Sequence, residues 1–169
     1  MAINLFTFVG MFDKALATAD HVLARGAEHA AAGGVGEAEM LGWRLIADMQ
    51  PLAFQIATVA TFGRNWPARA AGLPIPEDFP ERRDVAGLRA DLAAARAYLA
   101  TLTPAQFEGR DDAPVTFNIG GAMELTLPAG QWLAGFANTN LFFHLSIAYA
   151  ILRARGVPLG KRDMFAAGL

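Results

Sequence analysis

The stretch of sequence that decides the fold runs from Asn138 to Gly156 and reads Asn-Thr-Asn-Leu-Phe-Phe-His-Leu-Ser-Ile-Ala-Tyr-Ala-Ile-Leu-Arg-Ala-Arg-Gly. It has the length of a helix and ends at a glycine, the residue most often found just after a helix C-terminus. Asn140 and His144 are four residues apart, so a helix places both on one face, one turn apart. Their neighbours are so apolar that we expect this face to point inward.

An inward-facing Asn140 and His144 have two interpretations. They form either a buried hydrogen-bonding pair or part of a metal site. A metal would need two or three further ligands from other helices, and Asn140 offers only a carbonyl oxygen, a weak ligand for a transition metal. The stretch alone does not choose between these interpretations.

Three earlier segments show helical periodicity. Residues 4–31 carry an apolar stripe at three-to-four spacing and end in a glycine-rich stretch. Residues 37–71 predict a long second helix, in which Pro51 should produce a kink near residues 47–48. After an aperiodic connector over 72–80, residues 81–101 predict a third helix.

A short β-hairpin is expected before the last helix. Residues 115–119 and 123–127 alternate between apolar and polar, and Gly120-Gly121 between them is a turn signal. The last helix should begin near Pro128 and run to Gly156. The fold class predicted by these elements is all-α: one domain over residues 1–169, built as a four-helix bundle with a small hairpin.

Composition narrows the class of protein. Apolar residues make up 54% of the chain and charged residues 18%, so we expect further apolar surface to be buried in a homodimer. The net charge of −2, without any basic patch, predicts no nucleic-acid partner. No apolar run is long enough to cross a membrane, and the N-terminus lacks the pattern of a signal peptide, so we expect a cytoplasmic protein.

Asp48 and Gln55 of the second helix are the candidate partners of His144. They are seven residues apart and would share one helical face. Asp48 is either an exposed carboxylate or an inward one that meets His144 and raises the pKa of its imidazole. Gln55 reads as a hydrogen-bonding residue. The candidate pocket therefore consists of Asp48, Gln55, Asn140 and His144, with His144 and Asp48 as candidate metal ligands.

Other candidate residues and common catalytic motifs give less support for a functional site. His21 and His29 lack acidic partners at fixed offsets and read as partly exposed surface residues. Arg44 and Arg64 flank the second helix and read as solvated surface arginines, with the binding of a carboxylate as the alternative. The chain has no cysteine, which removes thiolate metal sites and a cysteine nucleophile. Phosphate-binding loops, His-Glu-x-x-His motifs and Gly-x-Ser-x-Gly elbows are also absent from the sequence.

Four segments carry a resemblance to a known family: residues 45–55, residues 102–107, residues 140–153, and the stretch Gly-Val-Pro-Leu-Gly-Lys-Arg-Asp at 156–163. With these segments the chain resembles an uncharacterised bacterial family, a domain of unknown function grouped with the DinB/YfiT-like metalloenzymes. The resemblance spans nearly the whole chain. It implies a bundle in up-down-down-up order and frequent dimers.

The resemblance also implies a site. The superfamily usually binds a divalent metal through one histidine of the second helix and a His-x-x-x-His pair of the last. Asn140 matches the first position of that pair and His144 the second. The second helix of this chain has no histidine, so Asp48 or Gln55 would have to substitute. Relatives include thiol-dependent transferases and detoxification enzymes, a link by analogy only.

Three functions stay open at this point. The first is a small-molecule site, of a degenerate metal-dependent hydrolase or transferase type, with either a divalent metal or no cofactor. The second is a non-catalytic binding or structural dimer whose polar cluster only specifies packing. The third is an interaction module that acts through its apolar surface.

Overall fold

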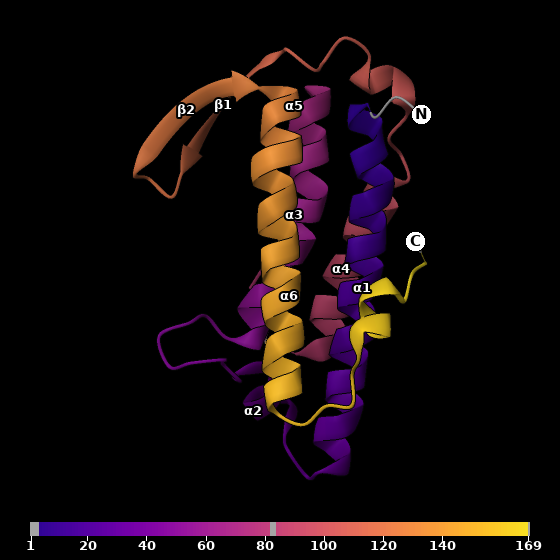
Figure 1. The fold of residues 1–169 in the computed structure, drawn as a ribbon, viewed down its shortest axis with the longest axis vertical. Coiled ribbons are helices and arrows are strands. Elements are labelled where there is room, and N and C mark those ends of the chain that lie inside the picture. Colours follow the sequence, from indigo (N-terminus) through magenta and orange to yellow (C-terminus); the bar gives the residue numbers. More distant parts are fainter. Residues whose placement is uncertain (1–3, 82–83, 169) are drawn as a thin grey trace.

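The computed structural model describes residues 4–81 and 84–168, and its first helix, α1, spans Leu5–Ala32 (Figure 1). The side chain of Asn4 accepts a hydrogen bond from the backbone N–H of Thr7 (3.2 Å), which caps the helix N-terminus. Phe12, Leu16 and Leu23 lie on the buried stripe that the sequence indicated. The helix expected over residues 4–31 is therefore confirmed.

The prediction of one long second helix over residues 37–71 is wrong. The structure divides this region into α2 (Glu37–Leu41), a loop over residues 42–51, and α3 (Leu52–Ala71). Pro51 precedes the first residue of α3 and does not kink a continuous helix. A proline has no N–H to donate and disfavours helical geometry in the residue before it, so the region breaks at this point. The loop projects from the side of the bundle (Figure 1).

The third long helix, α4, spans Val85–Leu99 and is shorter than the expected 81–101. Asp84 caps it by accepting from the N–H of Gly87 (2.5 Å). Glu81 is not helical, and residues 82–83 lie outside the described residues. The connector before α4 returns along the bundle, so α3 and α4 run in the same direction and the up-down-down-up order is confirmed (Figure 1).

The hairpin expected before the last helix is confirmed. A 3₁₀ helix, Pro104–Phe107, leads to β1 (Pro114–Ile119), which pairs antiparallel with β2 (Met123–Pro128). A helical path then runs through α5 (Ala129–Gln131), a π-helical segment (Trp132–Ala137) and α6 (Asn138–Ala154). The last helix is thus where the sequence placed it, with one π-helical interruption of the kind often found at functional sites.

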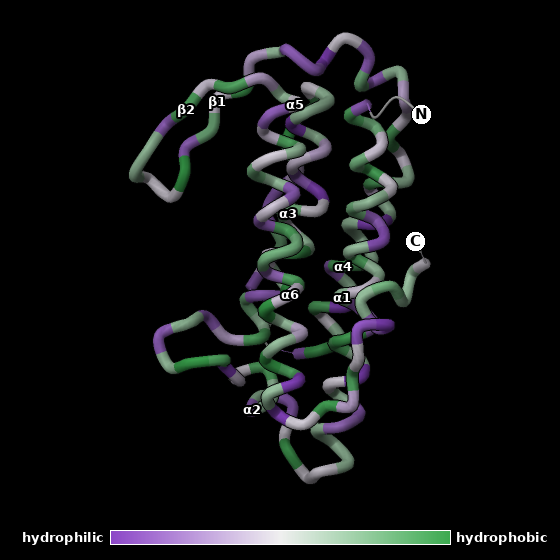
Figure 2. The backbone as a smooth tube through the Cα atoms, viewed as in Figure 1, coloured by the Kyte–Doolittle hydropathy of each residue, from purple (hydrophilic) through white to green (hydrophobic). Residues whose placement is uncertain are grey.

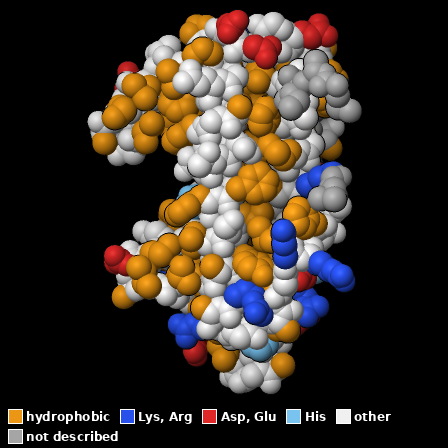
Figure 3. Space-filling view, in the orientation of Figure 1, with side chains coloured by type: hydrophobic (Ala, Val, Ile, Leu, Met, Phe, Trp, Pro, Cys, Tyr) orange, Lys and Arg blue, Asp and Glu red, His pale blue; other side chains and the backbone are white. Residues whose placement is uncertain are grey.

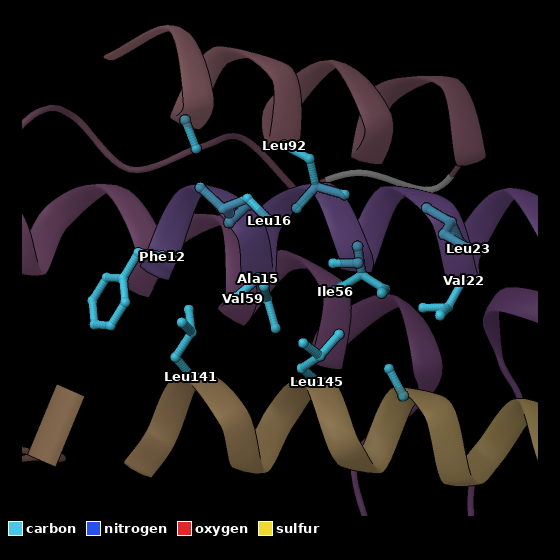
Figure 4. Packing of buried hydrophobic residues seen from close by; sticks show 14 of the residues in the cluster. Phe12, Ala15, Leu16, Val22, Leu23, Ile56, Val59, Leu92, Leu141 and Leu145 are labelled. Atoms are coloured by element: carbon cyan, nitrogen blue, oxygen red, sulfur yellow. The ribbon is translucent and has the colours of Figure 1, made fainter. Parts of the chain in front are cut away.

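One hydrophobic core runs along the bundle axis. Leu16 of α1, Ile56 of α3, Leu92 of α4, and Leu141 and Leu145 of α6 are fully buried within it (Figure 4). Along each helix hydrophobic residues alternate with polar ones, whereas the hairpin and the 42–51 loop also carry hydrophobic stretches away from the bundle (Figure 2). Among the described residues, no helix is long and apolar enough to cross a membrane.

Candidate functional site

The structure brings Gln55 of α3 and His144 of α6 into direct contact. The two helices pack closely, and the Nδ1 atom of His144 lies 2.7 Å from the Oε1 atom of Gln55. The Gln55 side chain is buried, and its Nε2 atom donates to the backbone carbonyl of Gln50 (3.0 Å). A chain of hydrogen bonds therefore runs from the end of the 42–51 loop through α3 to the imidazole on α6.

This chain of hydrogen bonds fixes the proton of His144. Because the carbonyl of Gln50 can only accept, it requires the Nε2 amide of Gln55 to face it, and Oε1 must then face His144. Oε1 is an acceptor, so the Nδ1 atom of the imidazole carries the proton. In the neutral ring, Nε2 is then left with a free lone pair and can accept a proton or a hydrogen bond.

Burial keeps this imidazole in its neutral form. His144 is half-buried, and desolvation lowers the pKa of its ring from the ordinary value because the charged imidazolium loses water contacts. At neutral pH the ring is therefore uncharged and has the protonation state of a general base. An inward carboxylate next to His144 would have had the opposite effect.

Aromatic rings surround His144 on several sides. The rings of Phe143, Phe54 and Phe62 have centroids 5.2, 6.0 and 6.3 Å from the imidazole. Phe54 and Phe143 are also exposed, which is unusual for such large apolar side chains and marks a surface able to contact a ligand.

This aromatic surface lies between the 42–51 loop and the hairpin along the bundle. The 42–51 loop joins α3 at its first residue, and the hairpin packs on α3 through Phe117 and Trp66, whose ring centroids are 4.9 Å apart. Gln55 and Phe62 lie between these two points of α3. The molecule is hollowed between the hairpin and the loop, and hydrophobic side chains gather on both projections (Figure 3). The His144–Gln55 pair thus lies on the side of the bundle that two apolar projections flank.

The other two predicted pocket residues are placed differently. Asn140 lies one turn from His144 on α6, and its amide donates to the carbonyl of Phe136 in the π-helical segment (2.9 Å). Asp48 lies on the exposed 42–51 loop and makes no hydrogen bond or ion pair with another described residue. The helical face that was expected to join Asp48 to Gln55 does not exist, because residues 42–51 are not helical.

Among the remaining candidate residues, the prediction for Arg64 is wrong. The sequence indicated a solvated Arg64, but its side chain is buried; it donates through Nε to Asn65 (3.0 Å) and through a second nitrogen to the carbonyl of Glu77. His21 is partly exposed as expected, yet it has an acidic partner: its Nε2 atom lies 2.8 Å from Asp163 of the C-terminal segment. His29 is half-buried near the end of α1.

A second set of polar residues on α3 was not expected from the sequence. Thr61, Asn65 and Arg69 follow one another at four-residue spacing and line a pocket with Asp78 of the connector and aromatic side chains. The four-residue spacing was visible in the sequence and indicates one helical face. The connector and the hairpin that complete the pocket were not visible there.

Metal-ligand chemistry is sparse throughout the described chain. Within residues 4–81 and 84–168, no group of three or more histidine, aspartate or glutamate side chains is close enough to hold a metal ion. At the His144–Gln55 pair, the Nε2 atom of the imidazole has no partner among the described residues, and the rings of Phe54 and Phe62 lie near the imidazole.

Comparison with known proteins identifies the family. The model of a domain of unknown function, DUF1993, matches residues 6–165. The chain belongs to this family. A solved structure with the same architecture is a DinB family member protein from Shewanella denitrificans, with 27% sequence identity and a TM-score of 0.83 over 95% of this chain and 90% of that one. No curated protein matches. The expected membership of a DinB-like family of unknown function is confirmed.

The protonation of His144 gives the first testable prediction. An NMR titration of the His144 ring, assigned with a His144→Gln variant, should give a pKa below about 6.5, the value of an unperturbed histidine. Gln55→Glu should raise this pKa, because a carboxylate at hydrogen-bonding distance favours the imidazolium. The matched Gln55→Leu variant, which adds no charge, should leave the pKa low. An equal pKa in all three proteins would contradict the role assigned to Gln55.

The same pKa direction sets the dependence of stability on pH. Because the folded pKa is lowered, the unfolded chain takes up the proton first as the pH falls. The contribution of His144 to stability is therefore complete above about pH 6.5 and is lost as the pH falls below that value. Denaturant unfolding at pH 7 and pH 5 should show this loss in the wild type and a smaller one in His144→Gln.

Proposed function

We propose that this protein binds a small molecule between α3 and α6 and accepts a proton from it through Nε2 of His144, in a hydrolysis or group-transfer reaction. The observation that carries this proposal is the hydrogen-bond chain from the Gln50 carbonyl through Gln55 to His144, because it holds the imidazole in one tautomer. A base must be neutral, oriented and accessible, and His144 has these properties.

The surroundings of His144 indicate the class of ligand. Phe54, Phe62 and Phe143 present ring faces and edges around the imidazole, so an apolar or aromatic group would pack there. The Nε2 lone pair would accept a proton from an O–H, N–H or S–H group of the bound molecule, or from a water that attacks the bound molecule. This combination of apolar walls and a single oriented polar atom is typical of small-molecule sites.

Hydrolysis of p-nitrophenyl acetate tests this proposal. We expect the wild type to accelerate it, with a rate that rises with pH and levels off above the pKa measured for the His144 ring. His144→Gln should lose most of this rate. The matched His29→Gln variant, which changes a half-buried histidine elsewhere on the bundle, should keep it.

The result also separates the catalytic role from a structural one. If His144→Gln keeps the full rate but loses about 1–3 kcal/mol of unfolding free energy, the hydrogen-bonded pair only specifies packing. The second function, a non-catalytic dimer, would then be favoured. A rate that follows neither His144 nor its pKa would contradict the proposal.

We further propose that the site works without a tightly bound metal. The candidate ligands His144 and Asp48 fit such an ion poorly, because Asp48 lies on an exposed loop and Gln55 occupies one nitrogen of the imidazole. The other polar groups at the site are amides, whose oxygens are weak ligands for transition metals. These donors support a base rather than a Lewis acid at this position.

Elemental analysis and metal titration test the metal proposal. Untagged wild type should hold no stoichiometric zinc, nickel or manganese. The double variant Gln55→His/Asn140→His, which places three imidazoles at the α3–α6 contact, should bind Zn²⁺ at least tenfold more tightly than the wild type. Stoichiometric metal in the wild type that disappears in His144→Gln would overturn the proposal.

We also propose that the protein forms a homodimer. An apolar groove of about 450 Å³ between α1, α6 and the C-terminal segment supports this, since Met11, Phe142 and the exposed Phe165 line it. Sedimentation equilibrium should show a dimer that Phe165→Asp weakens. Ile75→Asp, which changes another exposed apolar residue on the connector, should leave the dimer intact. A monomer at all concentrations would contradict this proposal.

A further inference from the structure

A pocket lies on α3, nearer the hairpin than the His144–Gln55 pair. It has a volume of about 200 Å³, and its polar wall is the stripe of Thr61, Asn65 and Arg69 at four-residue spacing. Phe62 and Trp66 of α3, Phe117 of β1 and Asp78 of the connector complete its lining. We call it the Arg69 pocket.

Arg69 is the unusual member of this lining. Its guanidinium lies 5.0 Å from the ring centroid of Phe117 and 5.6 Å from that of Trp66, so it rests against two aromatic faces. It makes no hydrogen bond or ion pair with another described residue. Burial lowers the pKa of Arg69, but an arginine stays charged at neutral pH. A half-buried cation with unused donors favours an anion as its partner.

The neighbouring polar groups do not supply this partner. Both ends of the Asn65 amide are in use: its oxygen accepts from Arg64 (3.0 Å), and its nitrogen donates to the carboxylate of Asp78 (3.3 Å). Asp78 attracts Arg69 electrostatically, but no hydrogen bond or ion pair joins these two described side chains. The donors left for a ligand are those of Arg69, the second N–H of the Asn65 amide and the hydroxyl of Thr61.

We propose that the Arg69 pocket binds a compact carboxylate with a flat apolar body, such as an aromatic acid. The carboxylate would accept two parallel hydrogen bonds from the planar guanidinium, a geometry that arginine provides and lysine does not. The flat body would pack against Phe62, Trp66 and Phe117, whose rings prefer stacked or edge contacts.

This site adjoins the one at His144, and the ring of Phe62 borders both. Gln55 and Arg69 are fourteen residues apart on α3, which corresponds to about 21 Å along a helix axis. A carboxylate held by Arg69 therefore lies well away from the imidazole, and its binding does not require the proposed base. Phosphate should bind less well, because it has no apolar body and would bring more negative charge towards Asp78.

The test is a titration of the ¹⁵N-labelled full chain with benzoate, followed through the indole N–H resonance of Trp66 and assigned with Trp66→Phe. We expect a saturable shift of this resonance and none at Trp43, which lies outside the pocket. Benzamide, the neutral isostere, and inorganic phosphate should each bind at least about tenfold more weakly, since a charge-assisted hydrogen bond is lost or the apolar contacts are missing.

Variants assign the effect to Arg69. Arg69→Gln should weaken benzoate binding about tenfold or more, and the matched Arg162→Gln, an exposed arginine of the C-terminal segment, should bind as the wild type does. Asp78→Asn should tighten binding by about threefold, because it removes a competing negative charge at the pocket edge.

Three results would each overturn the inference: benzamide binding as tightly as benzoate, Arg69→Gln binding unchanged, or Asp78→Asn binding more weakly. The last result would mean that Asp78 is the partner of Arg69 and that the pocket is structural. If Arg69→Gln does not fold, the benzoate–benzamide comparison on the wild type and the Asp78→Asn variant still decide the question.

Discussion

The close packing of α6 against α3 is the constraint on which the rest of this structure depends. Leu141 and Leu145 of α6 and Ile56 of α3 are fully buried at the centre of the bundle, and their burial sets how the two helices face each other. This packing takes the amide of Gln55 out of water, and a buried amide needs partners. It finds them in the carbonyl of Gln50 and in His144. The site is thus a consequence of core packing and of the need to satisfy one buried side chain.

The two sides of the bundle have different physical characters. Between α1 and α4, Arg89 pairs with Asp20 and Arg96 with Asp13, each through two nitrogens, on a surface partly exposed to water. Such partly exposed pairs add little to stability. On the α3 side, aromatic rings and half-buried polar groups line the surface around His144 and Arg69. A less hydrated environment strengthens each polar contact there, and both proposed sites lie on that side.

Membership of the DUF1993 family and the likeness to a DinB family member agree with the bundle and its connections, and they leave the activity open. What distinguishes this chain is the residue chemistry at the place where the superfamily resemblance implies three histidines. Gln55 and Asn140 are amides, and each is engaged with protein atoms, Gln55 with His144 and Asn140 with Phe136. A single imidazole oriented by an amide is suited to proton transfer or hydrogen bonding.

The sequence by itself determined α1, the hairpin and the last helix, because apolar periodicity, turn glycines and caps act over a few residues. It also placed Asn140 and His144 one turn apart. It failed over residues 42–51, where apolar residues at helical spacing lie in a loop and Asp48 is exposed. Only the tertiary structure decided that Gln55 meets His144, that Arg64 is buried, and that Arg69 faces two aromatic rings. These contacts join segments far apart in the chain, and their energies come from packing and desolvation that no local pattern records.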